Sequence, residues 1–241
     1  MVRSSIGDLL TEYGVRVVQE ARQRRKEVQI ELPDNLAAAD AATVVRAGAE
    51  LRALQLTGTA DGVDAPAMTL RECRASGVSF AAANMERLDG RELIFDRCTF
   101  TGAKLPRLAI HRTLFRGCRM TGVDIPDGSL TDVVFEDCKL DVASFRFTRL
   151  KRVLFRDCIL TEVDLGGATA TAVRFERCDL GRAQLSHARL AGCDLRTCGL
   201  TGVIGVTSLR GAIISEEQLL DLAPVFAADL GLDVRAHDGA A

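Results

Sequence analysis

Cysteine is the residue type in this chain with the widest potential chemistry. A thiolate can act as a nucleophile, ligate zinc or form a disulfide. The 241 residues include eight: Cys73, Cys98, Cys118, Cys138, Cys158, Cys178, Cys193 and Cys198. None form a CxxC pair, and none of the three histidines stands at metal-ligand spacing from a cysteine or an acid. Because GxSxG, Walker and GxGxxG motifs are also missing, we expect no catalytic residue, metal site, cofactor or enzymatic activity.

The spacing of the cysteines indicates packing instead of chemistry. All eight occupy the same position of a five-residue frame, and Cys98, Cys118, Cys138, Cys158, Cys178 and Cys198 recur every twenty residues. Five phenylalanines also recur every twenty residues, and they occupy the position of the five-residue frame that lies two after the cysteine position: Phe95, Phe115, Phe135, Phe155 and Phe175. A double period of five and twenty is typical of a repeat architecture. We expect these residues to form columns in a core, with the thiols reduced, buried and unreactive.

The elements that must position these columns follow from the frame. From residue 80 to 200 the last residue of each five is Phe, Leu, Ile or Met, except at Gly90 and Ala170, and the residue two before it is usually small. Residues i−2 and i of an extended segment point to the same side, so both can face inward. A period of five fits neither a helix nor a flat strand, but a chain that bends once per repeat and closes a coil after four bends. The prediction is an all-β solenoid of about seven coils, stacked at ~4.8 Å.

Particular stretches resemble a known family. The segments "FRDCILTEVDLGGA", "FERCDLGRAQLSHARL" and "CDLRTCGLTGV" are similar to the pentapeptide repeat proteins, over roughly residues 70 to 214. The resemblance implies a right-handed quadrilateral β-helix. The ending "LRGAIISEEQLLDL" resembles the loop-less, gyrase-interacting actinobacterial type, in which a similar ending makes a dimer. The resemblance therefore implies a homodimer that binds DNA gyrase or topoisomerase IV and protects it from quinolone-type or natural poisons.

The two ends are expected to differ from the repeat. We divide the chain into an N-terminal helix and irregular segment (1–67), the repeat β-helix (68–214) and a C-terminal capping or dimerisation helix and tail (215–241). An amphipathic helix is expected near 5–27, and "TADGVDAPA" at 59–67 is expected to be a loop. Ser215 and Gln218 predict the start of the last helix, Gly231 its end, and Pro224 a split or kink. Its apolar residues are candidate dimer contacts: Leu219, Leu220, Leu222, Val225 and Phe226.

Two outward columns are candidate binding surfaces. The residues just before the phenylalanine centres form an apolar row: Ile94, Leu114, Val134 and Leu154. Such a row marks a contact, either with the chain's own N-terminal segment or with a partner protein. A second column is mildly basic: Arg112, Arg149, Lys151, Arg152 and Arg189. Without interleaved aromatic residues, a solvated face is favoured there over direct nucleic-acid binding.

The charge balance limits the possible functions. The net charge is −2, with 22 basic and 17 acidic residues in 68–214 and 1 and 6 in 215–241. A rod that imitated duplex DNA over ~33 Å would carry roughly twenty negative charges, so the repeat body does not imitate DNA. No segment predicts a signal peptide or a membrane span, so we expect a cytoplasmic protein with neither membrane nor small-molecule partner. Two functions stay open: topoisomerase binding, and a general protein-protein interaction scaffold that uses the apolar row and the N-terminal helix.

Overall fold

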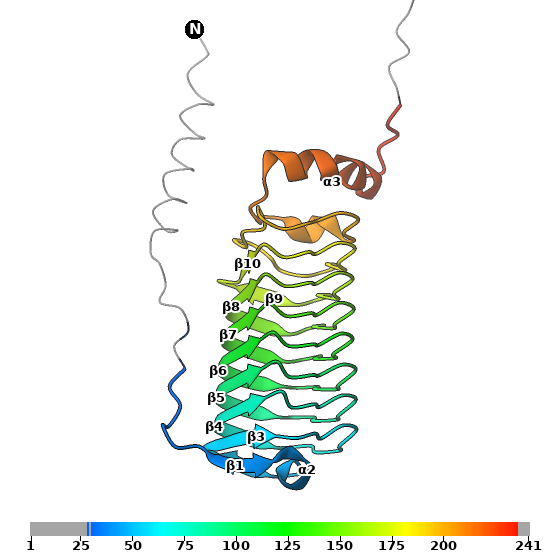
Figure 1. Cartoon of the computed structure of the whole chain (residues 1–241). Coiled ribbons are helices and arrows are strands. Elements are labelled where there is room, and N and C mark those ends of the chain that lie inside the picture. Colours follow the sequence, from blue (N-terminus) through cyan, green and yellow to red (C-terminus); the bar gives the residue numbers. More distant parts are fainter. Residues whose placement is uncertain (1–27, 29, 236–241) are drawn as a thin grey trace, which may run out of the picture.

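The structure, a computed structural model, describes residue 28 and residues 30–235 and is a parallel β-solenoid (Figure 1). Long strands stack along the rod in chain order: β4 (Thr69–Ser76), β5 (Asp89–Asp96), β6 (Ala109–Arg116), β7 (Ser129–Glu136) and β8 (Arg149–Arg156). Two short strands, β9 (Thr169–Thr171) and β10 (Arg174–Glu176), both pair with β8. Phe95 pairs with Phe115 and Phe115 with Phe135, so each coil contains twenty residues. The predicted fold is confirmed.

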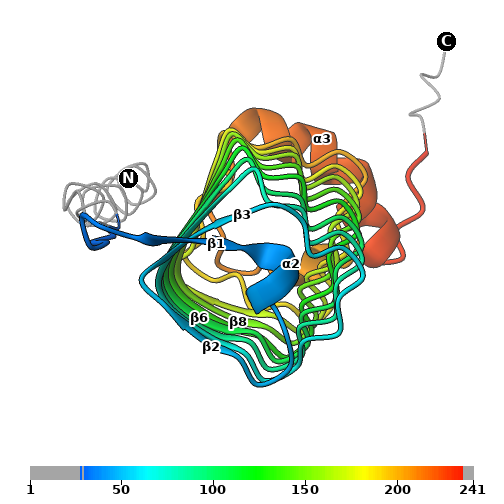
Figure 2. The same cartoon turned by 60° about the horizontal axis from the view of Figure 1, so that its bottom comes forward.

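Each coil has four sides, as the view along the rod shows (Figure 2). The long strands cover two adjoining sides, with the bend inside the strand. The other two sides pair through single parallel bridges, such as Ser79 with Thr99 and Asn84 with Lys104. Backbone hydrogen bonds therefore run between successive coils on all sides, and each side presents two columns of side chains inward, the core centres and the residues two before them, and the others outward.

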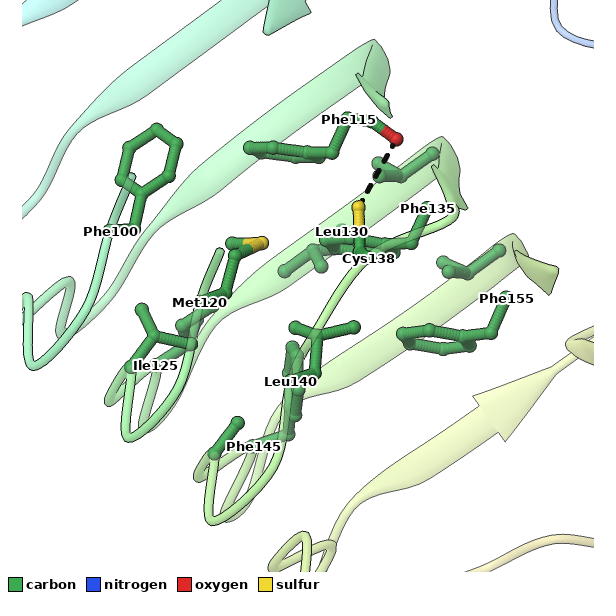
Figure 3. Close-up of a cluster of buried hydrophobic side chains, with 14 of the residues drawn as sticks. Phe100, Phe115, Met120, Ile125, Leu130, Phe135, Cys138, Leu140, Phe145 and Phe155 are labelled. Carbon is green, nitrogen blue, oxygen red and sulfur yellow. Dashed lines mark hydrogen bonds between the residues drawn. The ribbon is translucent and has the colours of Figure 1, made fainter. Parts of the chain in front are cut away.

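The core consists of columns of like side chains (Figure 3). The rings of Phe115 and Phe135 stack with centroids 4.8 Å apart, and both are buried. The thiol of Cys138 donates to the carbonyl oxygen of Phe115 at 3.5 Å. All eight cysteines are buried and free of disulfides, and burial raises the pKa of Cys193 to about 11. The small size and the apolarity of cysteine therefore explain why this residue type occupies these buried positions.

The chain bends at the residue two positions after each core centre. There the backbone is left-handed, with φ of 55° at Glu92, 51° at Arg112 and 56° at Val142. A left-handed residue other than glycine costs roughly 1–2 kcal/mol. Many corners nevertheless hold such residues, so core packing and the hydrogen bonds between coils must offset this cost.

The parallel ladder begins earlier than the expected boundary at residue 68. Strands β1 (Ala37–Asp40), β2 (Glu50–Arg52) and β3 (Leu54–Thr57), with the short helix α2 (Ala41–Val44), form the first coil. β1 pairs with β3, and both β2 and β3 pair with β4. The segment 59–67, expected to be a loop, continues the solenoid, since Thr59 bridges to Ser79. The expected helix near 5–27 lies outside the described residues.

The frame is hidden in this first part of the solenoid for two reasons. Its centres are small, because Ala60 and Ala65 fill the buried positions taken elsewhere by Leu or Phe. The coil is also one residue shorter, since Leu51 pairs with Leu70. A shift of one residue removes the five-residue signal.

The C-terminal end is closed by α3 (Glu216–Asp229). Its capping box matches the prediction: Gln218 N–H donates to the Ser215 hydroxyl at 3.2 Å, and Ser215 N–H donates to the Gln218 side chain at 2.8 Å. The Gln218 amide also donates to the carbonyls of Leu195 and Cys198, at 2.8 and 2.6 Å, so it satisfies acceptors of the last coil. Pro224 lies inside the helix, which continues to Asp229 and is not split. Within the described residues no helix is long and apolar enough to cross a membrane.

Candidate interaction surfaces

The predicted apolar row is a continuous feature of the structure, which we call the apolar stripe: Ile94, Leu114, Val134 and Leu154. These residues are direct neighbours on β5 to β8. Their chain neighbours, such as Leu93 and Phe95, are buried in the core, so the stripe faces outward. In register it continues to Arg74 at one end and to Arg174 at the other.

The stripe is less exposed than its outward position suggests. Ile94, Leu114 and Val134 are half-buried, and Leu154 is only 5% exposed. Ile94 and Arg74 line a groove together with Ile30, Leu32 and Leu36, residues that precede β1. A described part of the N-terminal segment therefore lies across a groove from the first coils of this face.

Charged columns border the stripe on both sides. Glu136 receives Arg116 at 3.2 Å and Arg156 at 3.5 Å, and Arg156 also pairs with Glu176 at 3.0 Å. These pairs form a ladder of alternating charge, which Arg196 does not extend, because Arg196 pairs with Asp194 on its own coil. Exposed pairs of this kind contribute a few tenths of a kcal/mol each.

The mildly basic column is partly neutralised. Arg112 pairs with Glu92 at 2.8 Å, and Arg152 pairs with Asp132, which also lies 3.2 Å from His111. The hydrogen bonds from Arg152 hold the pKa of Asp132 below its usual range. The other members of the column are Arg149, Lys151 and Arg189. Two of the five predicted cations therefore belong to ion pairs between coils, which weakens the case for an anionic partner on this face.

The α3 surface corrects the predicted dimer contact in part. Leu222 is 1% exposed because it packs on the last coil, so it serves the cap and cannot be a contact in a dimer. Val225 and Phe226 are half-buried against the core, whereas Leu219 and Leu220 are exposed, at 51% and 75%.

Sequence reasoning missed Leu232 and Val234, which extend this apolar surface. Leu230, Leu232 and Val234 are exposed at 69%, 60% and 77%, and the last two line a shallow hollow with Leu220 and Pro224. The missed signal was the two apolar residues, Leu232 and Val234, that alternate with charged ones after Gly231. We call Leu219, Leu220, Leu230, Leu232 and Val234 the α3 apolar face.

The geometry defines the class of protein. The described residues form a rod of twenty-residue parallel coils with outward stripes and a capped end. No group of His, Cys, Asp or Glu side chains within residues 30–235 could hold a metal ion. The family model of the pentapeptide repeat region matches residues 91–165, 108–185 and 128–204, so residues 91–204 are a pentapeptide repeat region.

Solved structures provide further comparisons. HetL, a pentapeptide repeat protein involved in heterocyst differentiation regulation from the cyanobacterium Nostoc, is 18% identical, with 89% of this chain and 98% of HetL covered and a TM-score of 0.39. QnrB1, a plasmid-mediated fluoroquinolone resistance protein, is 20% identical in a trypsin-treated form, with 83% and 95% covered and a TM-score of 0.36. No curated protein matches the chain significantly.

Proposed function

We propose that the protein is a non-enzymatic homodimer that binds a type II topoisomerase, DNA gyrase or topoisomerase IV, and protects it from quinolone-type or natural poisons. The observation that carries the proposal is the α3 apolar face at the end of an uninterrupted rod. Leu220 and Val234 are at least three-quarters exposed there. Exposed apolar patches of this kind mark protein contacts. The resemblance of the C-terminal ending to gyrase-interacting family members adds the partner.

The charge distribution supports a topoisomerase contact near the centre of such a dimer. The repeat body 68–214 has five more basic than acidic residues, 22 against 17, so its length is a poor substitute for DNA. Acidic residues gather at α3 instead, where Glu216, Glu217 and Asp221 are exposed. A two-fold axis at α3 doubles this acidic group and brings both copies together. A DNA-binding groove of positive potential attracts such a centre.

The dimer is tested with Leu220→Glu. A charge in the middle of an apolar contact is expected to convert a dimer to a monomer in sedimentation velocity at micromolar concentration, since an unpaired buried charge is strongly unfavourable. Ile204→Glu is the control, because Ile204 is equally apolar and 53% exposed but lies on the rod. A wild-type protein that sediments as a monomer at these concentrations contradicts the dimer.

Topoisomerase binding is tested with purified gyrase. The protein is expected to inhibit supercoiling and to reduce the cleaved DNA that accumulates with a quinolone, and Leu220→Glu is expected to weaken both effects. If a large molar excess changes neither supercoiling nor quinolone-induced cleavage, the proposed partner is wrong.

A further inference from the structure

The apolar stripe has the dimensions of a docking surface for one helix. It is one residue wide, because the neighbouring outward columns hold charged residues such as Glu136 on one side and Asp132 on the other. It is bounded along the rod by Arg74 and Arg174. Ile94 and Leu154 lie three coil steps apart, about 14 Å at the strand spacing. A narrow apolar row between charged rows matches the apolar face of an amphipathic helix.

The described N-terminal residues lie close to one end of the apolar stripe. The segment before β1 rises along the strand-bearing side of the rod (Figure 1). Its side chains Ile30, Leu32 and Leu36 line one groove with Ile94. The chain that precedes residue 28 therefore joins the described part close to the Ile94 end of the stripe. A segment tethered this close has an effective concentration in the millimolar range.

The sequence of that preceding segment fits the stripe. Ile6, Leu9, Leu10, Tyr13 and Val17 recur at helical spacing. A helix rises 1.5 Å per residue, so the eleven steps from Ile6 to Val17 span about 16 Å, close to the length of the stripe. Acidic and basic residues, among them Glu12 and Arg16, separate the apolar positions.

Leu154 supplies independent support. Within the described residues it is the one buried apolar side chain that does not belong to the core cluster. Its side chain faces away from the core but is only 5% exposed. Outward apolar residues on other sides of the rod, Val142 and Ile159, are 57% and 45% exposed.

We propose that residues 5–27 form an amphipathic helix that lies along the apolar stripe of the same chain and covers it. The occupant is thus internal, and the stripe is not an open site for another protein. A partner that used the stripe would first have to displace this helix. The inference is independent of the topoisomerase proposal, because it concerns a different face of the rod.

The test is hydrogen-deuterium exchange of the full-length protein. Amides of residues 6–21 are expected to exchange at least tenfold more slowly than in an unstructured peptide of the same sequence, equally at low and high protein concentration. Exchange at the unstructured rate overturns the proposal and leaves the stripe to a separate partner. Protection that disappears on dilution also overturns it, since the helix then lies on a second copy.

Variants of the stripe and of the N-terminal helix test whether the two contact each other. Leu114→Glu combined with Val134→Glu is expected to abolish the protection of residues 6–21, whereas Ile159→Glu on another side is expected to leave it intact. Leu9→Glu with Tyr13→Glu gives a second, reciprocal test that leaves the solenoid sequence unchanged. Persistent protection in the folded Leu114/Val134 variant or in the Leu9/Tyr13 variant overturns the proposal.

Discussion

Two buried threonines of the core columns allow a sharp test of how the solenoid is stabilised. Thr113 and Thr148 are both 0% exposed, and each lies two residues before a core centre, Phe115 and Leu150 respectively. Among the described residues the Thr113 hydroxyl has no hydrogen-bond partner. The Thr148 hydroxyl donates to the Ile125 carbonyl at 2.6 Å and accepts from the Gly128 N–H at 3.3 Å. The same substitution should therefore have opposite effects at the two sites.

Thr113→Val is expected to stabilise the protein. Its neighbours in the column are Leu93 and Val133, so valine matches the surroundings and the shape. An unsatisfied buried polar group costs roughly 1–3 kcal/mol, so the gain is about 1 kcal/mol, or roughly 2–4 °C in melting temperature for a protein of this size. Thr148→Val removes both hydrogen bonds and leaves the Gly128 donor and the Ile125 acceptor unpaired, which is expected to cost about 2 kcal/mol.

The assay is thermal and urea unfolding of wild type and both variants, followed by circular dichroism. The difference between the two variants, about 3 kcal/mol, is the quantity of interest because both replace a threonine hydroxyl with a methyl group. If Thr113→Val destabilises the protein, or if both variants shift in the same direction by similar amounts, hydrogen-bond satisfaction does not control these positions.

Two further predictions follow from the corners and the thiols. Val142→Gly is expected to stabilise the protein by about 1 kcal/mol, because Val142 is exposed and left-handed at φ 56°. The control Ile159→Gly should destabilise it by a similar amount. Equal losses of unfolding free energy for the two variants in urea contradict the strain argument. Burial raises the pKa of Cys193 to about 11, above the pKa of about 8.5 in an unfolded chain. Between roughly pH 8.5 and 11 the unfolded state therefore binds fewer protons than the folded state. Stability then falls as pH rises, by up to about 1.4 kcal/mol per pH unit. Unfolding midpoints at pH 7 to 10.5 should fall less steeply in Cys193→Ala, and identical slopes exclude this thiol as a contributor.

The core was predictable because large, repeated residues occupy it. Phe115, Phe135 and Cys138 recur in one frame, and the fold follows from that frame. Where the centres shrink to Ala60 and Ala65 and a coil loses one residue, the same architecture leaves no readable period. The start of the solenoid was therefore misplaced although its physics is unchanged.

The left-handed conformation of the corners was not predicted and the α3 apolar face was predicted only in part, for different reasons. Val142 and Glu92 violate the local preference of non-glycine residues for negative φ, and this conformation is imposed by core packing and by the hydrogen bonds between coils, which are not local in sequence. In α3, composition gives the number of apolar residues but not the docking angle of the helix. Leu222 is buried between α3 and the last coil, whereas Leu220 and Leu232 are exposed.

The uniform register has a consequence for how such a rod can change length. Because Phe115, Phe135 and Phe155 occupy equivalent places one coil apart, excising any twenty consecutive residues between 90 and 170 rejoins every column and yields a shorter rod with the same surfaces. An excision of five residues keeps the local frame, but rotates everything beyond the junction by a quarter turn and places unlike side chains over one another. Insertions and deletions in whole coils are thus the changes that this architecture tolerates.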